Sequence, residues 1–221
     1  MFTELDRTVE YLHALNEGDE KERLLSEFCF NEQEIQQIKS DIERIENDNF
    51  ESTTEKGHAL ENLAKSILSC KNLFEVDTNL HSSTNEVDLS LKLKPGSQIL
   101  LNSFFPRLSN LVYIGECKNY NKKIDVTWIG KVHSLICLHN FDVCLLFSKH
   151  GFTGRKWNAG SGLSRKIALR ENRYIIDINF KDLEKLKEIS ILELIHAKYS
   201  EIIHDIDYAE YLSKHPAEEI K

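Results

Sequence analysis

The segment Val112–Lys118 constrains the fold of this chain more than any other stretch. Its β-branched, aromatic and aliphatic residues predict a strand. Because side chains alternate faces along a strand, Glu116 and Lys118 project to the same side, two positions apart. A carboxylate and an ammonium group at the end of an apolar strand are costly to half-bury without a partner or a task.

A second strand is predicted upstream, over 86–93, by strict alternation. Val87, Leu89 and Leu91 share one face of it, and Asp88 lies on the other. If the two strands are neighbours, Asp88, Glu116 and Lys118 converge. Two carboxylates can bind a hard divalent cation through oxygen, and a nearby lysine can orient or deprotonate a water. These groups are the minimum required for metal-assisted phosphodiester hydrolysis.

The composition is that of a soluble globular protein. The 221 residues are enough for one sizeable core and one small appendage, and 41% of them are hydrophobic. No apolar run has the length of a membrane span, and the first residues lack a signal-peptide pattern. The five cysteines form no C-x-x-C pair, so we expect reduced thiols in a cytoplasmic protein rather than a disulfide or zinc framework.

Charge is distributed unevenly along the chain. The formal net charge is −8, which by itself disfavours a nucleic-acid binder. Residues 1–55, however, hold 16 acidic and 5 basic residues, whereas residues 116–173 hold 4 acidic and 11 basic ones. Local potential attracts a polyanion, so the segment that begins with Glu116 is the expected binding surface.

Three regions are expected. Residues 1–52 form an acidic helical extension, residues 53–190 the main domain, and residues 191–221 an acidic helical tail. Within the extension, isoleucines at 35, 38, 42 and 45 repeat at 3-4-3 spacing. This spacing favours a helical layer packed on the main domain and leaves open a homodimer or protein-partner seam.

The main domain is predicted to be α/β, with helices on both faces of a mixed sheet. Glu61 lies at the rim of the apolar stripe of a helix over 55–70, from which it can reach toward the sheet. Residues 97–110 are expected to be a loop or a short helix. The remaining predicted elements are strands over 73–77, 141–147 and 173–180 and helices over 126–138, 162–171 and 181–194. The pair Gly151 and Gly154 favours an ordinary glycine-rich connection over a phosphate-binding loop.

Glu61 on a helix, Asp88 in a strand and Glu116-Cys117-Lys118 in the next strand resemble the PD-(D/E)xK nuclease signature. The Mrr-like restriction endonuclease branch is the more similar one, since Gly57 and Leu60 precede Glu61 as in its first helix. The likeness covers residues 55–190 and implies a restriction-endonuclease-like α-β-β-β-α-β core. Val87, rather than proline, precedes Asp88, and the loop between the two strands is long.

The resemblance implies a metal-dependent endonuclease acting on DNA, in restriction or anti-phage defence. Asp88, Glu116 and the backbone carbonyl of Cys117 would bind Mg²⁺, for which Mn²⁺ can substitute. Lys118 would position water or stabilise the pentavalent phosphorus, and Glu61 would complete the metal shell directly or through water. The residues expected to contact nucleic-acid phosphates are Lys122, Lys123, Lys131, Arg155, Lys156, Arg165 and Arg170.

Other interpretations remain open at this stage. Glu116 and Lys118 can form a half-buried ion pair without catalysis, and the basic residues can be a solvated face. A separate hypothesis is that the core is a catalytically silent nucleic-acid-binding or assembly subunit of a defence complex. An RNA-cleaving nuclease would use the same residues.

Overall fold

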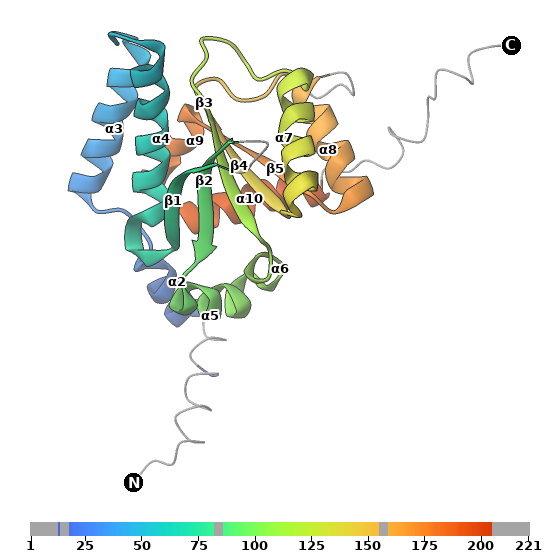
Figure 1. The fold of residues 1–221 in the computed structure, drawn as a ribbon. Helices are drawn as coiled ribbons and strands as arrows, with labels where there is room; N and C mark the ends of the chain where they lie inside the picture. The colour runs from blue at the N-terminus through green and yellow to red at the C-terminus, as the bar shows by residue number, and fades with distance from the viewer. Residues whose placement is uncertain (1–12, 14–17, 82–85, 155–158, 205–221) are drawn as a thin grey trace, which may run out of the picture.

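The computed structural model describes residue 13 and the ranges 18–81, 86–154 and 159–204. In this part of the chain a mixed five-stranded sheet lies between two layers of helices (Figure 1). The α/β class predicted from the sequence is therefore confirmed. None of the described helices is both long enough and apolar enough to cross a membrane.

The sheet has the simple strand order β1-β2-β3-β4-β5. The first three strands are antiparallel neighbours, whereas β3, β4 and β5 run parallel. This arrangement brings the carboxyl ends of β3, β4 and β5 and the start of β2 to one edge of the sheet. The strands are β1 (Phe74–His81), β2 (Glu86–Leu93), β3 (Tyr113–Lys118), β4 (Val143–Ser148) and β5 (Tyr174–Asn179).

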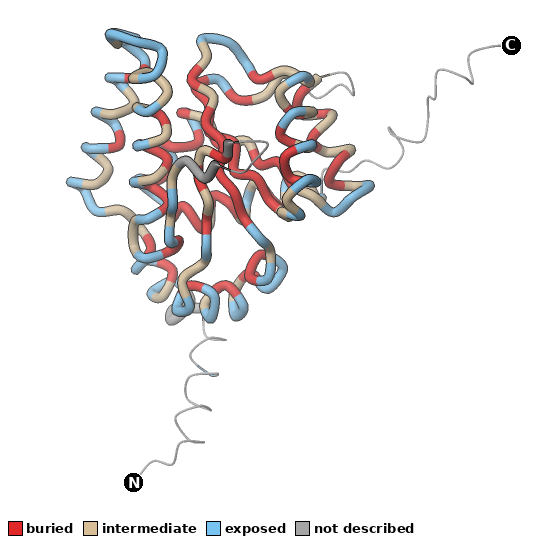
Figure 2. Tube along the Cα trace, in the orientation of Figure 1, coloured by how far each residue is buried: buried red, intermediate tan, exposed pale blue. Residues whose placement is uncertain are grey.

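Each face of the sheet has its own hydrophobic cluster. The smaller one joins alternate residues of β3, β4 and β5 to α7 (Val126–His139) and α8 (Gly160–Glu171). The larger one lies on the other face. Its helices include α2 (Gly18–Ser26), α3 (Glu32–Glu46), α4 (Thr53–Ser69), α5 (Pro95–Phe104), α6 (Pro106–Ser109), α9 (Phe180–Leu183) and α10 (Ile191–His204). Figure 2 shows that β3, β4 and β5 consist almost entirely of buried residues, whereas β1 and β2 also carry exposed ones.

Helix ends follow local capping chemistry. The Oγ of Ser52 accepts a hydrogen bond from the N–H of Glu55 and begins α4, as the S-x-x-E spacing predicts. Asp125 caps α7 by accepting from the N–H groups of Thr127 and Trp128. Both caps lie at the edge of the sheet where β3 ends, so the two helices begin beside it.

The chain departs from the sequence prediction in three places. Residues 97–110 form most of two helices, α5 and α6, whose residues Leu101 and Leu108 are buried. The strand predicted over 73–77 extends to residue 81. The helix predicted over 181–194 is wrong, because the chain forms α9 (Phe180–Leu183) and a 3₁₀ turn (Glu184–Lys187) before α10.

The predicted boundary at residue 190 is not a domain boundary. Ser190 and Glu193 form a reciprocal capping pair, in which each side chain accepts from the backbone N–H of the other. This pair begins α10, whose residues Leu192, Ile195 and Tyr199 are buried in the larger core. Residues 191–204 therefore belong to the main domain. The rest of the predicted tail, 205–221, lies outside the described residues.

The N-terminal helices also join this core. Ile38 and Ile45 are buried there, and Ile35 and Ile42 pack against it from the same face of α3. The isoleucine seam is therefore occupied by the protein's own core, as the intramolecular interpretation of the 3-4-3 spacing predicted. The first 12 residues of the predicted extension lie outside the described part.

Candidate active site

The antiparallel ladder between β2 and β3 ends next to the acidic side chains. Its last pair is Leu89 opposite Gly115. Just beyond, the carboxylate of Asp88 accepts a hydrogen bond from the N–H of Cys117, with an Oδ2–N distance of 2.8 Å. The side chain of Asp88 thus continues the contact between the two strands beyond the last backbone pair and fixes this residue against β3.

Lys118 joins the two carboxylates. Its ammonium group forms an ion pair with Glu116 and lies 3.7 Å from Oδ2 of Asp88. All three side chains are at most 16% exposed, so little water screens these charges. The convergence expected from the alternation of the two strands is present.

Burial changes the protonation of this group. It raises the pKa of Glu116 to about 7, against the opposing attraction of Lys118, and the charge of Asp88 adds to the rise. Burial alone would lower the pKa of Lys118, but the two carboxylates outweigh it and raise that pKa above its ordinary value. The two carboxylates therefore favour the ammonium form of Lys118 in this arrangement.

Oxygen atoms suited to a divalent cation remain available here. Oε2 of Glu116 is buried and has no hydrogen-bond partner. A strand residue directs its N–H and C=O toward the same neighbouring strand, so the carbonyl of Cys117 faces Asp88 as its N–H does. An all-oxygen set of two carboxylates and a carbonyl matches the preference of Mg²⁺ or Mn²⁺. The residues present thus fit the metal that the sequence signature implies.

A cleft of about 380 Å³ opens over Asp88, Cys117 and Lys118. Helix α4 forms one wall, and Glu61 lies in that wall as its position at the rim of the apolar stripe predicts. The Oε2 of Glu61 lies 3.1 Å from Nδ1 of His58. The cleft is lined by Thr53, Lys56, Gly57, Glu61, Asp88, Cys117, Lys118, Asn119 and Tyr120.

Glu61 reaches the cleft from α4, whereas the other two acids come from β2 and β3. Within the described ranges, the carboxylates of Glu61, Asp88 and Glu116 do not meet as a trio within 4.8 Å. Glu61 lines the same cleft as Asp88 and is available to a metal ion there, directly or through a water molecule.

Two residues directly after β3 complete the cleft and were missed by sequence reasoning. The buried Asn119 donates from Nδ2 to the carbonyl of Lys56 at 2.6 Å and thereby ties β3 to α4. The ring of Tyr120 lies 5.4 Å from that of Trp128 on α7. Their position immediately after the E-x-K triplet was the available signal, since residues that follow a strand end at the same edge of the sheet.

The predicted phosphate-contacting residues do not form one group. Lys122 and Lys123 are exposed on the loop after β3, and Lys131 lies 4.3 Å from the ring centroid of Trp128. Arg165 instead lines a separate cavity of about 210 Å³ beside β5. Arg170 is exposed in the last turn of α8. Arg155 and Lys156 lie outside the described residues.

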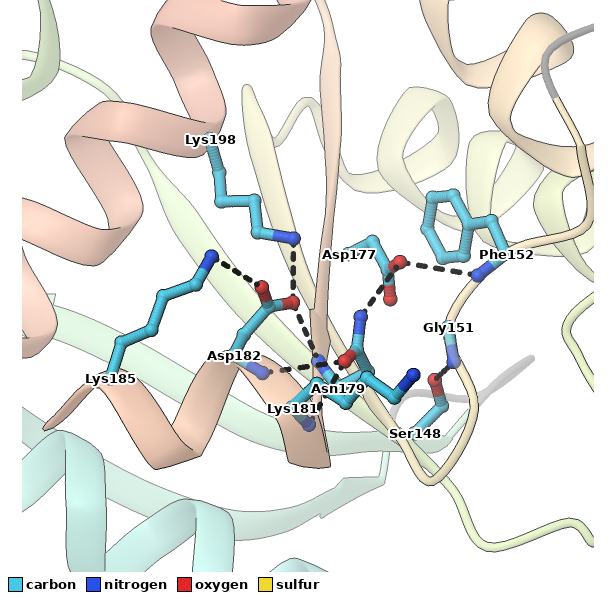
Figure 3. A network of polar contacts seen from close by, with 9 residues as sticks. All are labelled: Ser148, Gly151, Phe152, Asp177, Asn179, Lys181, Asp182, Lys185 and Lys198. Atoms are coloured by element: carbon cyan, nitrogen blue, oxygen red, sulfur yellow. Dashed lines mark hydrogen bonds and ion pairs between the residues drawn. The ribbon is translucent and has the colours of Figure 1, made fainter.

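The loop after β4 is an ordinary glycine-rich connection. Gly151 has a φ of +70°, and its N–H donates to Oγ of Ser148. The N–H of Phe152 donates to Asp177, which also accepts from Asn179 (Figure 3). These backbone donors are used within the protein, so they do not form a phosphate cradle.

The fold and the site identify the chain only as an α/β protein with a cleft that contains carboxylates and one central lysine. No known family model matches the chain, and no curated protein or solved structure is detectably similar to it. Its function is therefore inferred from the geometry of the site.

Proposed function

We propose that this protein is a divalent-metal-dependent endonuclease that hydrolyses phosphodiester bonds in DNA. One observation carries the proposal. Asp88 and Lys118 line an open cleft, Lys118 forms an ion pair there with the buried Glu116, and an oxygen of Glu116 has no hydrogen-bond partner. A buried carboxylate oxygen without a partner is costly, and a bound cation would offset this cost.

The order of elements supports the same assignment. Helix α4, the antiparallel strands β1, β2 and β3, helix α7 and the parallel strand β4 follow the α-β-β-β-α-β order of the PD-(D/E)xK nucleases, with α5 and α6 inserted between β2 and β3. The metal-binding and lysine positions lie at the edge where such enzymes act. We therefore propose a restriction-endonuclease-like fold of the Mrr-like branch.

The roles of the residues follow from their chemistry. Asp88, Glu116 and the Cys117 carbonyl would hold the metal, which when bound polarises the scissile phosphate and lowers the pKa of a coordinated water. Lys118, held as an ammonium, stabilises the negative charge that develops on the phosphoryl oxygens. Glu61 completes the metal shell directly or through a water molecule.

The substrate is inferred from charge and accessibility. Lys122 and Lys123 extend from the strand that carries the site, and Lys131 lies on the adjacent helix. Such exposed cations bind phosphates without reading sequence. DNA is the substrate proposed, and restriction or anti-phage defence in the cytoplasm is the proposed role by analogy with Mrr-like nucleases.

The test is cleavage of supercoiled plasmid with Mg²⁺ or Mn²⁺, comparing the wild type, Lys118→Ala and the exposed β2 variant Lys92→Ala. The proposal requires metal-dependent nicking or linearisation by the wild type and Lys92→Ala, and its loss in Lys118→Ala. Cleavage of RNA but not of plasmid would make the protein a ribonuclease. Binding of duplex without cleavage of either polymer would identify a silent binding subunit and overturn the proposal.

A further inference from the structure

A second cluster of metal-binding side chains lies on α7 and α8, the helices of the smaller hydrophobic cluster. His133 and Cys137 are one turn apart on α7, and Glu171 is the last residue of α8. Their ligand atoms lie within 4.8 Å of one another, which holds for no other trio of His, Cys, Asp or Glu in the described chain. None of the three lines the active-site cleft.

The distances approach those of a tetrahedral metal site. The Sγ of Cys137 lies 3.3 Å from Nε2 of His133 and 3.8 Å from Oε2 of Glu171. In a tetrahedral zinc site with metal–ligand bonds of about 2.0–2.3 Å, ligand atoms are about 3.3–3.6 Å apart. The His133–Glu171 distance of 2.7 Å is that of a hydrogen bond and must lengthen. The side chain of Glu171 is 42% exposed, so it is free to move outward.

The donor atoms select a different metal from the active site. A thiolate, an imidazole and a carboxylate suit Zn²⁺ and similar borderline ions, whereas Mg²⁺ prefers oxygen alone. His133 and Cys137 come from one rigid helix, so two of the three donors are already positioned. His133 and Cys137 have H-x₃-C spacing, and Glu171 follows 34 residues after Cys137. This pattern contains no C-x-x-C pair, which is why the sequence did not predict a zinc site.

The charges around the cluster permit a cation. The hydrogen bond with His133 holds the pKa of Glu171 below its usual value, so this carboxyl is ionised at neutral pH. Arg173 is the nearby positive charge, but its guanidinium donates to the carbonyl of Phe141 and to Asn140. It is therefore engaged with the loop that ends α7.

We propose that His133, Cys137 and Glu171 bind one zinc-type divalent ion, with a fourth position open to water. Such an ion links α7 to α8. These two helices cover the sheet face that carries Glu116 and Lys118, and α7 also supplies Trp128, whose ring centroid is 5.2 Å from the ammonium group of Lys118. The site lies outside the cleft and is separate from the proposed chemistry, so it stands or falls independently of nuclease activity.

The test is a titration of the chelator-treated, reduced full-length protein with Co²⁺, followed by displacement with Zn²⁺. Coordination by Cys137 gives a sulfur-to-cobalt charge-transfer band that saturates at one equivalent. We expect Cys137→Ser to abolish the band and Glu171→Gln to weaken binding at least about tenfold. The band should persist in Cys29→Ser, which changes a cysteine outside the cluster, and in Asp88→Asn, which changes a residue of the cleft.

Two further readouts keep the outcome clear. Zn²⁺ should raise the Tm of the wild type and of Asp88→Asn but not that of His133→Gln, and far-ultraviolet circular dichroism should show that each variant is folded. A wild type without the band, or a band that persists in Cys137→Ser, overturns the proposal. Loss of the band in Cys29→Ser assigns the metal to a different thiol and overturns it equally.

Discussion

The carboxylate of Asp88 accepts a hydrogen bond from the backbone N–H of Cys117 across the end of the β2–β3 ladder. This contact gives Asp88 two tasks. It fixes β2 against β3, and it places a negative charge beside Glu116 and Lys118. The two tasks make different demands on the side chain, because the first needs an oxygen acceptor and the second needs a charge.

Asp88→Asn should separate the two tasks. The amide oxygen can still accept from Cys117, so stability should change by less than about 1 kcal/mol, whereas metal-dependent cleavage should fall at least about a hundredfold. Asp88→Ala leaves the N–H without its partner and should cost about 1–3 kcal/mol in addition. Urea unfolding and plasmid cleavage measure the two effects. Asp77→Asn, at an exposed position of β1, is the control, and equal cleavage by both asparagine variants would refute the role of Asp88.

The convergence of this site could be predicted from sequence because its determinants are local. Alternation along 86–93 gives the face of Asp88, and two-residue spacing places Glu116 and Lys118 together. Only the pairing of the two strands had to be assumed. The same locality explains why α4 and α7 begin close to their predicted positions, since each is started by a capping residue next to it in sequence.

Features that depend on packing between distant elements could not be predicted. Arg165 was assigned to a nucleic-acid surface from its helix alone, but Ser164, Ile167 and Ala168 are buried and orient α8 so that Arg165 lines another cavity. The acidic composition after residue 190 suggested a tail. Charge averaged over a segment conceals an apolar face when the acidic residues lie on the other side of the helix, as in α10.

Stability should depend on pH through Asp177 on β5. Burial raises the pKa of this carboxyl, and its Oδ1 is buried without a hydrogen-bond partner. A raised folded-state pKa means that the folded protein holds the proton more tightly than the unfolded chain does, so this contribution to stability is lost as pH rises through the folded-state value. Asp177→Asn removes the ionisation. Its Tm relative to the wild type should therefore be higher at pH 7 than at pH 4.

Asp182 provides the matched control for this measurement. Its carboxylate lies 2.5 Å from the ammonium group of Lys198 and 3.2 Å from that of Lys185 (Figure 3). Asp182→Asn removes the carboxylate charge that pairs with both lysines, so it should destabilise the protein at pH 7 by about 1.5–3 kcal/mol. A Tm difference for Asp177→Asn that does not change with pH would contradict the assignment of the titrating group.

Lys149 connects α3 to the loop beside the cleft. Its side chain is buried and donates to the carbonyl of Ile45 at 2.8 Å and to Oδ1 of Asn121 at 3.0 Å. Lys149→Met keeps the length of the side chain but loses both bonds, so it should lower the free energy of unfolding by about 1–3 kcal/mol. Lys123→Met, at an exposed position of the same region, should change it by less than about 0.5 kcal/mol. Equal urea midpoints for the two variants would show that the connection contributes nothing.

Gly115 permits the close approach of β3 to β2 immediately before the Glu116-Cys117-Lys118 triplet. A Cβ at this position would lie 3.0 Å from both Cβ and Cδ1 of Leu89, whose side chain is fully buried. Gly115→Ala should therefore separate the strands where Asp88 contacts Cys117, with a cost of about 1–3 kcal/mol and a loss of cleavage.

Gly130→Ala tests whether that loss is specific to the close approach. Gly130 lies inside α7, where an added Cβ meets nothing within 4 Å. Alanine is the better helix former, so this change should stabilise the protein by about 0.5–1 kcal/mol and leave cleavage intact. Thermal unfolding and plasmid cleavage of both variants give the comparison. Because the two substitutions add the same methyl group, opposite signs would assign the cost at Gly115 to the packing of β3 against Leu89, whereas equal signs would remove that explanation.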